Sequence, residues 1–519
     1  MQYIMFRKNW PFLIALLLFT LLLFKNPFSI RTLISNFEPF PDSFYYLVPA
    51  RCFTQGKGLT MCLQNGQKFF QMTSWLYSLV QIPVFLINSD ARSFYFTNLF
   101  LTFASLWVFY LIIKKTTTQQ WLQFFVLFLY ASSYHLYWLP TLAMAENLLL
   151  LIFLLSIYFL FFKSTISRLV VALLIGLAFY FTKSAAIILA PTYIMIYLIK
   201  FTVENREFVA KNLKKIIGIF FISTISILFW KANLLKDLYD AIFVNQKGAW
   251  FSLQYFPEQF KFYLATIWGQ NTRFLWDSRP LYPQWLAIGA ILGGLTIRRK
   301  HLFLLLTLIS LNLSQICFMS LFYSNDARYI IIILPSALLG FALFLEKIFC
   351  SYRNIKFYVP TYFLLFIFIL YFANNFIRLK SQISLNLKYA ETPWWYLSIL
   401  DYNKFFAQNT FANKPYLIAL HSPFLVDFYS NQQYQLLPLS SQQDFRGMSQ
   451  AVWEIDFTND LLNIYQEKIK QGEKLFITNY GTSASTTFAS DFAQIKNNFI
   501  LEEKQSGCHN LCNIYQLSL

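Results

Sequence analysis

The chain carries a series of apolar segments, and this feature constrains its fold more than any other. A helix that spans a bilayer needs about 20 mainly apolar residues, because unsatisfied backbone groups are too costly in hydrocarbon. We interpret eleven segments as such helices: 10–24, 93–113, 121–139, 147–162, 168–182, 184–200, 215–233, 283–297, 302–322, 329–349 and 357–377. Only 13% of the 519 residues are charged, against about 25% in soluble domains. The sequence therefore predicts a mainly α-helical, polytopic membrane protein.

Short basic clusters between the apolar segments predict the orientation. Cytoplasmic loops of membrane proteins carry an excess of lysine and arginine. With eleven spans, all clusters fall on one side: residues 7–8, 114–115, 163–168, 200–215, 298–300 and 347–356. We therefore predict a multi-pass protein of the cytoplasmic (inner) membrane, with the N-terminus inside and the segment after Ile377 outside. These clusters also account for the formal net charge of +18, so no nucleic-acid partner is expected.

One apolar stretch, residues 69–87, does not fit this alternation. If it spanned the membrane, all later basic clusters would lie outside. We interpret it as a helix in the outer interface, interrupted by Pro83. The predicted domains are a membrane domain, 1–377, whose first outer loop is 25–92, and an extracytoplasmic domain, 378–519.

The C-terminal segment has the pattern of a small α/β domain. Strands are expected near 415–420, 474–480, 499–504 and 511–517, and helices near 422–430, 459–470 and 488–497. Gly472 stands at the expected stop of the second of these helices. The segment has no glycine-rich phosphate loop, so we expect an accessory, non-catalytic domain.

Two close cysteine pairs lie on the side predicted to be oxidising. Cys52 and Cys62 share the first outer loop, and Cys508 and Cys512 share the C-terminal segment. Both spacings are compatible with disulfides, and the sequence leaves each pairing open.

Placing an ionisable residue beside a membrane span costs free energy, so each such residue is a candidate for a structural or functional role. Asp42, Glu146, Lys183 and Arg328 all lie at the predicted outer ends of spans or in outer loops. Any one of them has a structural alternative, as a helix cap or as a side chain reaching the interface. Their convergence on one face predicts a shared polar cavity there.

Asp42 is the strongest catalytic candidate. It stands in Phe37-Glu-Pro-Phe-Pro-Asp-Ser-Phe-Tyr-Tyr, where two prolines prevent a regular helix through Glu38 and Asp42. A carboxylate at a half-buried interface is suited to act as a general base. The alternative is that Asp42 caps the following helix.

The two basic residues are candidate phosphate ligands. Arg328 opens a span together with Tyr329, and its guanidinium can hold a phosphate through two hydrogen bonds. Its alternative partners are Asp326 and lipid headgroups. Lys183 can neutralise a phosphate or reach toward the interface, and Glu146 can orient a substrate hydroxyl or pair with Lys183.

These motifs resemble those of the GT-C glycosyltransferases, in the branch of the protein O-mannosyltransferases and the aminoarabinose transferases of lipid A. The first-loop segment Pro41-Asp-Ser-Phe-Tyr-Tyr-Leu-Val-Pro-Ala-Arg51, followed by Gln55-Gly-Lys-Gly58, is similar to the family's first outer loop. Three further segments resemble the family in the same order: Met144-Ala-Glu-Asn-Leu, Gly176-Leu-Ala-Phe-Tyr-Phe-Thr-Lys183 and Arg328-Tyr-Ile-Ile-Ile-Ile-Leu-Pro335. The resemblance places Asp42 at the position of the family's catalytic acid. Ser43 departs from it, since many relatives have a second acid there.

The resemblance implies a transferase that moves a sugar from a polyprenyl-phosphate carrier to an acceptor at the outer face, with inversion. We assign Asp42 as the catalytic residue. The candidate substrate-binding residues are Glu38, Tyr46, Glu146, Lys183, Arg328 and Tyr329. The acceptor is an unidentified lipid, protein or polysaccharide, and membrane lipids surround the chain. No metal site or other cofactor is expected, with a divalent cation as the alternative.

Two other functions compete with this interpretation. A transporter or flippase of an anionic lipid or lipid-linked sugar would be expected to show repeats and spans broken near mid-membrane. No clear repeat is present, and the charges gather at one face. A non-enzymatic scaffold that binds through the outer α/β domain is the second alternative.

Overall fold

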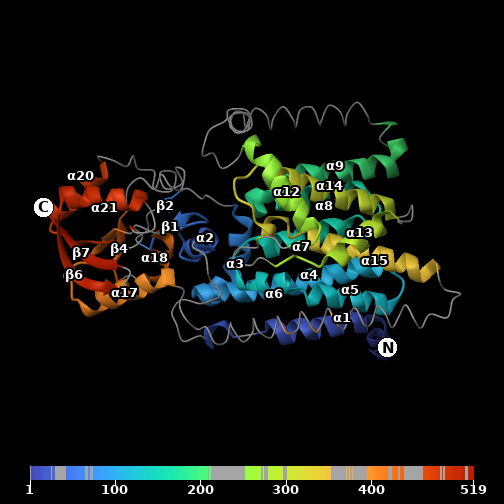
Figure 1. Ribbon diagram of the computed structural model, residues 1–519, viewed down its shortest axis with the longest axis horizontal. Coiled ribbons are helices and arrows are strands. Elements are labelled where there is room, and N and C mark those ends of the chain that lie inside the picture. Colours follow the sequence, from blue (N-terminus) through green and yellow to red (C-terminus); the bar gives the residue numbers. More distant parts are fainter. Residues whose placement is uncertain are drawn as a thin grey trace. The chain divides into compact units, whose positions relative to one another are not determined.

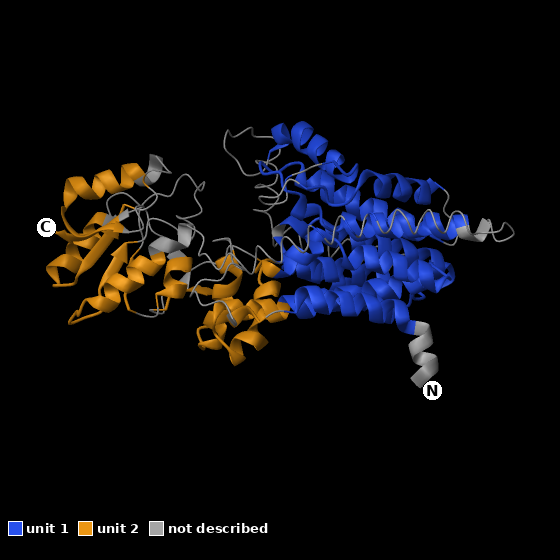
Figure 2. Ribbon diagram, turned by 60° about the horizontal axis from the view of Figure 1, so that its bottom comes forward, with its two compact units in different colours: residues 1–25, 98–140, 145–383 blue, residues 26–97, 141–144, 384–519 orange. Residues whose placement is uncertain are grey.

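The computed structural model divides the chain into two compact units. Unit 1 comprises residues 1–25, 98–140 and 145–383, and unit 2 comprises residues 26–97, 141–144 and 384–519 (Figure 2). The structure describes residues 2–24, 26–29, 43–64, 68–69, 74–208, 210–211, 252–270, 273, 279–295, 301–351, 370, 373, 377, 394–418, 423–430, 433–437, 460–479, 482, 486–508 and 512–519.

Unit 1 is a bundle of helices, most of which run side by side in both ribbon views (Figures 1 and 2). Its longer helices are α1 (Gln2–Leu23), α4 (Phe94–Thr116), α5 (Gln120–Ala131), α7 (Glu146–Phe159), α8 (Ile166–Thr182), α9 (Leu189–Glu204), α12 (Phe256–Ile267), α13 (Gln284–Leu295), α14 (Leu302–Met319) and α15 (Ile333–Ser351). Short elements connect them: α6 (Tyr134–Trp138), η4 (Leu139–Thr141), η5 (Ser184–Ala186), η6 (Leu253–Tyr255) and η8 (Ala327–Ile330). The first four residues of α4 belong to unit 2.

The outward faces of these helices are apolar. On α8, Leu174 is 59% exposed and Leu177 is 50% exposed, and Leu306 on α14 is 50% exposed. Among the described residues, two helical stretches are long and apolar enough to cross a membrane, residues 91–116 and Leu302–Met319, and six apolar helices are shorter. Exposed faces of this kind suit a lipid environment, which supports the expected helical membrane protein. The count of eleven spans stays a prediction, and spans 215–233 and 357–377 lie outside the described residues apart from isolated positions.

The segment 121–139 is not the single helix that we predicted. It divides into α5 and α6, because Ser133 has an extended backbone with ψ of 124°. The Ser132 hydroxyl bonds back to the carbonyl of Leu129, at 3.4 Å. Serine side chains compete for backbone hydrogen bonds in this way and so favour helix ends, a local effect that the apolar composition conceals.

Helices α13 and α15 pack closely through glycine. A Cβ atom added to Gly293 would lie 1.9 Å from the carbonyl oxygen of Gly340 on α15. At the adjacent Gly294, the nearest atom to such a Cβ is a terminal methyl of Leu305, at 3.5 Å. Small residues permit this kind of close backbone approach between helices in membranes.

We expect Gly293→Ala to destabilise unit 1 by about 3 kcal/mol, because the clash is with backbone and only a separation of the two helices can relieve it. Thermal unfolding of the purified protein in detergent measures the effect. Gly294→Ala is the matched control and should leave the unfolding midpoint unchanged or slightly raised, since alanine favours a helix by up to about 1 kcal/mol over glycine. Equal midpoints for the two variants would contradict the close packing.

Unit 2 brings the first predicted outer loop together with the C-terminal segment. From the first loop come η1 (Pro27–Ser29), α2 (Phe44–Thr54), β1 (Met61–Cys62), β2 (Lys68–Phe69), α3 (Leu76–Ile87) and η3 (Ala91–Ser93). Helix α3 continues through Pro83, so the interruption expected there is wrong. The Pro83 side chain is exposed, and a proline at such a position removes one backbone hydrogen bond without entering the core.

The first loop contains one of the two disulfides that the sequence left open. Cys52 on α2 is bonded to Cys62 on β1, with 6.0 Å between the Cα atoms. In the C-terminal segment, the backbones of Cys508 and Cys512 lie opposite each other in an antiparallel strand pair, and the disulfide considered there stays a prediction.

The C-terminal segment contains a five-stranded sheet of order β4-β3-β5-β7-β6. Its strands are β3 (Tyr416–Ile418), β4 (Gln435–Leu437), β5 (Leu475–Thr478), β6 (Ile500–Cys508) and β7 (Cys512–Ser518). Strands β4, β3 and β5 are parallel, and β7 is antiparallel to both β5 and β6. The helices are α17 (Trp394–Gln408), α18 (Pro423–Tyr429), α20 (Asp460–Lys470) and α21 (Thr486–Asn498). The expected strands and helices are present, and β4 and α17 were missed.

A buried ion pair joins the two parts of unit 2. The Arg51 Nη2 atom on α2 donates to Asp427 Oδ2 on α18, at 2.7 Å, and to the Cys62 carbonyl, at 3.2 Å. The amide of Gln64 donates to the same carboxylate, at 3.1 Å from each oxygen. Burial raises the pKa of Asp427, and the positive charge of Arg51 opposes this shift.

The domain limits predicted from the sequence, with a boundary at residue 377, stay a prediction.

Candidate functional site

Three chain segments of unit 1 bring the candidate residues Glu146, Lys183, Arg328 and Tyr329 together. Glu146 is the first residue of α7, where a carboxylate is favoured by the unpaired amides of the helix start. Lys183 follows the last residue of α8 in extended backbone, with φ of −160°. Arg328 and Tyr329 lie in the short helix η8, which Asp326 caps by accepting from the Arg328 amide at 2.9 Å.

Glu146 is the centre of the charged cluster. Its Oε1 atom forms an ion pair with the Lys183 ammonium and lies 3.8 Å from Arg328 Nε. Arg328 Nε is also 3.2 Å from Asp326 Oδ2, so the alternative pairing that we considered for Arg328 is present. Glu146 is 1% exposed and both cations are 9% exposed. The cluster is therefore a buried network in which two formal positive charges balance two negative charges.

Tyr329 contacts the cluster through its hydroxyl group and through its aromatic ring. Its hydroxyl accepts a hydrogen bond from Arg328 Nη2 at 3.1 Å. Its ring lies 4.8 Å from the Lys183 ammonium and 5.0 Å from the Arg328 guanidinium carbon, measured to the ring centroid. Both distances are within the range of cation–π attraction. The ring therefore contacts both cations of the cluster.

One carboxylate oxygen of the cluster is not satisfied. The Oε2 atom of Glu146 is buried and has no hydrogen-bond partner within the part of the chain that the structure describes. A buried acceptor without a partner costs about 1–3 kcal/mol. A substrate hydroxyl or amine could supply that hydrogen bond, and a phosphate could compete with Glu146 for the two cations.

The roles of the other candidate residues, Glu38, Asp42 and Tyr46, stay predictions. Glu38 and Asp42 are outside the described residues, so their proposed roles stay predictions. The N-cap position of α2 is Ser43, which makes no side-chain capping bond. Tyr46 lies on α2 in unit 2, where its ring packs edge-on against Tyr77 of α3, at 5.5 Å. The sequence singled out Tyr46 for its place in the first loop, and its role in substrate binding stays a prediction.

Sequence reasoning missed Gln315, a fully buried residue of α14. Its Nε2 atom donates to the Ala185 carbonyl at 2.7 Å and to the Tyr329 carbonyl at 3.0 Å. The available signal was an amide side chain within an otherwise apolar span, which has to find partners in the bundle.

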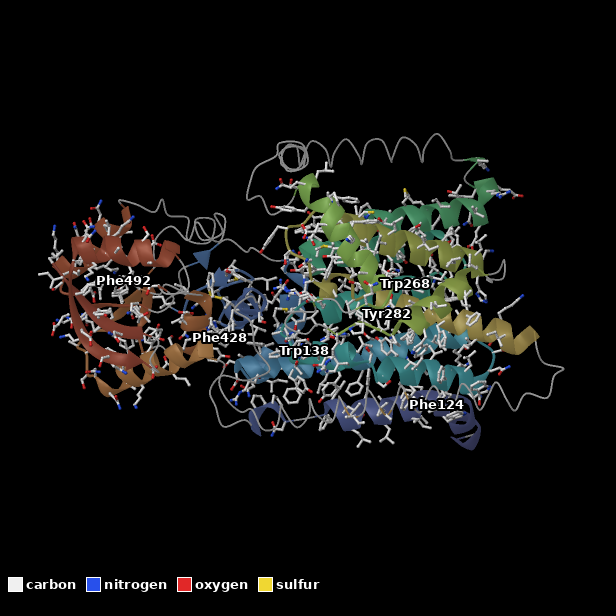
Figure 3. The ribbon with its side chains drawn as sticks, in the orientation of Figure 1. Phe124, Trp138, Trp268, Tyr282, Phe428 and Phe492 are labelled. Atoms are coloured by element: carbon white, nitrogen blue, oxygen red, sulfur yellow. A yellow bond between two sulfur atoms is a disulfide. The ribbon has the colours of Figure 1, made fainter. Side chains whose placement is uncertain are left out.

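Trp268 and Tyr282 lie close together in the sequence but have different environments. Trp268 ends α12 and is 43% exposed, whereas Tyr282 is 3% exposed and donates to the Ile267 carbonyl at 2.9 Å (Figure 3). His135 on α6 is 1% exposed and its Nε2 atom lies 3.0 Å from the Pro280 carbonyl, as expected for a packed histidine. Within the described ranges, no group of three or more histidine, cysteine or acidic side chains is arranged to hold a metal ion.

Comparison with known proteins identifies the fold. No protein-family model matches the sequence, and no curated protein matches it. Two similar solved structures are crystal structures of ArnT from Cupriavidus metallidurans, one in the apo state and one bound to undecaprenyl phosphate. Each is 12% identical in sequence, and each alignment covers 97% of this chain and 96% of that chain, with TM-scores of 0.56 and 0.57. The likeness over nearly the whole chain confirms the GT-C-like fold that the sequence motifs predict.

Proposed function

We propose that this chain is a membrane glycosyltransferase that takes a sugar from a polyprenyl-phosphate carrier and transfers it to an acceptor at the outer face of the membrane. The observation that carries the proposal is the buried cluster of Lys183, Arg328 and Glu146 at the junctions between helices. Two cations beside one unsatisfied carboxylate oxygen suit a ligand that combines a phosphate with a hydroxyl or amine. The similarity to ArnT structures, one of them bound to undecaprenyl phosphate, supports a polyprenyl carrier.

The proposed reaction is a single displacement. Asp42 removes the proton from the acceptor hydroxyl or amine, which attacks the anomeric carbon of the sugar. The bond between that carbon and the phosphate oxygen breaks, and the polyprenyl phosphate leaves with the electron pair. Inversion at the anomeric carbon follows from one displacement. The leaving phosphate gains negative charge, which Lys183 and Arg328 stabilise in a site of low dielectric constant.

The proposed topology follows the basic clusters. The N-terminus lies in the cytoplasm, and the first outer loop and the segment after residue 377 lie outside. The chain is then a multi-pass protein of the cytoplasmic membrane whose reaction takes place at the outer leaflet. Glu38 and Tyr46 would contact the acceptor or the sugar from the first loop.

The experiment that tests the proposal has a cellular part and a purified part. Surface glycolipids and glycoproteins of cells with and without the gene are compared by mass spectrometry, and one glycan modification is expected to disappear. The purified protein in detergent is then mixed with lipid extract and acceptor fractions from the cells that lack the gene. We expect transfer to resume in this mixture. Detergent micelles do not separate two compartments, so a transporter or a scaffold would not restore glycan transfer. Absence of transfer in this mixture would reject the enzyme.

A further inference from the structure

Gln315 connects the two segments that carry the cations of the cluster. Its side-chain nitrogen has two hydrogens, and both are used. One bonds to the carbonyl of Ala185, two residues after Lys183, at 2.7 Å. The other bonds to the carbonyl of Tyr329, which directly follows Arg328, at 3.0 Å.

The two segments that Gln315 joins are short turns between helices rather than regular helix. Ala185 lies in η5, between α8 and α9, and Tyr329 lies in η8, before α15. Turns of this kind have backbone carbonyls without helical partners, and an unsatisfied carbonyl is costly in an apolar interior. Gln315 is 0% exposed, so its side-chain amide is shielded from water and donates its hydrogen bonds to these carbonyls instead.

We propose that Gln315 is a positioning residue for the transfer reaction, which fixes the separation of Lys183 and Arg328 by holding their two turns against α14. This inference rests on the proposed function, because it assigns the two cations to a phosphate. Lys183 is one residue from η5 and Arg328 is within η8, so a shift of either turn moves its cation. A phosphate requires both cations at a defined separation, and positional errors of about 1 Å are costly in such sites.

Helix α14 supplies a matched control one turn earlier. The Asn312 amide nitrogen donates to Ser336 Oγ on α15, at 2.8 Å, and to the Leu308 carbonyl, at 2.7 Å. Asn312 therefore makes a similar but only partly buried polar contact between helices, to a residue other than the two cations and their turns. Its loss should affect the packing of the bundle and leave the cluster in place.

The test compares Gln315→Met with Asn312→Leu in the full-length protein, with undecaprenyl phosphate as the probe. Methionine has nearly the length of glutamine and no donor. We expect Gln315→Met to bind the probe about tenfold more weakly than the wild type, and Asn312→Leu to bind it as the wild type does. A single structural role for both residues would instead give equal losses of probe binding and would overturn the proposal.

Two further measurements separate a positioning role from a general loss of stability. Combining Gln315→Met with Lys183→Met should weaken probe binding less than the sum of the two single effects, because both act on the same contact. Additive effects would overturn the proposal. Hydrogen exchange without any ligand should be faster in both peptides 183–190 and 327–333 of Gln315→Met, and unchanged in those of Asn312→Leu.

The exchange measurement also distinguishes the two possible failures. If the wild type does not bind undecaprenyl phosphate but Gln315→Met loosens both peptides, the proposed phosphate site is wrong and the connection between the turns stands. If the wild type binds the probe and neither peptide loosens, Gln315 does not hold the turns and the inference fails.

Discussion

Replacing Asp42 with asparagine is expected to lower the rate of sugar transfer by about a thousandfold, because the acceptor would lose its general base. Asparagine keeps the size of the side chain and can still accept a hydrogen bond from the backbone. Folding and membrane insertion should therefore be retained. The rate is measured by mass spectrometry of the glycosylated acceptor, with donor and acceptor fractions taken from cells that lack the gene.

Asp90→Asn is the control for the loss of a carboxylate from the same outer loop. Asp90 accepts hydrogen bonds from the Arg92 amide, at 2.8 Å, and from Arg92 Nε, at 3.0 Å. These are local contacts at the start of η3, so this variant should keep its activity. Turnover by Asp42→Asn at the rate of the wild type would remove Asp42 from the chemistry and would redirect the search for a base to Glu38 and Glu146.

The sequence predicted the charged cluster because an ionisable side chain beside apolar membrane segments has a high free-energy cost. Glu146, Lys183 and Arg328 are isolated ionisable residues among apolar ones, and such residues must find partners. The ion pairs of Glu146 with both cations show that they do. The sequence offered the pairing of Glu146 with Lys183 only as one alternative, because the two residues are 37 positions apart. It did not predict the pairing of Glu146 with Arg328.

The elements that were missed depend on contacts over long distances in the chain. Strand β4 is formed by Gln435–Leu437 and pairs in parallel with β3, a contact that the local sequence does not show. Arg51 and Asp427 are 376 residues apart, so no local periodicity could connect them. The contacts of Gln315 were also missed. Its partners are backbone carbonyl groups, which every residue type has, so the sequence gives no sign of which residues it bonds to.

Replacing Lys183 with methionine is expected to have two separate effects, on stability and on phosphate binding. The Glu146 carboxylate would keep only Arg328, at 3.8 Å, as a cationic partner in a buried site. Leaving a buried charge without its partner costs about 3 kcal/mol, which should lower the thermal unfolding midpoint by several degrees. Binding of undecaprenyl phosphate should weaken by about tenfold to a hundredfold, because one charge-assisted contact is lost.

The double variant Lys183→Met with Glu146→Gln separates these effects. It removes the two charges together, so the buried site is again balanced and most of the lost stability should return. Phosphate binding should not return, because the lysine is still absent. Glu146→Gln alone should behave in the opposite way. It leaves one positive charge of the cluster in excess, which lowers stability without ligand, and undecaprenyl phosphate should restore that stability by binding the folded state. If the double variant recovered binding along with stability, Lys183 would serve only to neutralise Glu146, and the phosphate would have to be held elsewhere.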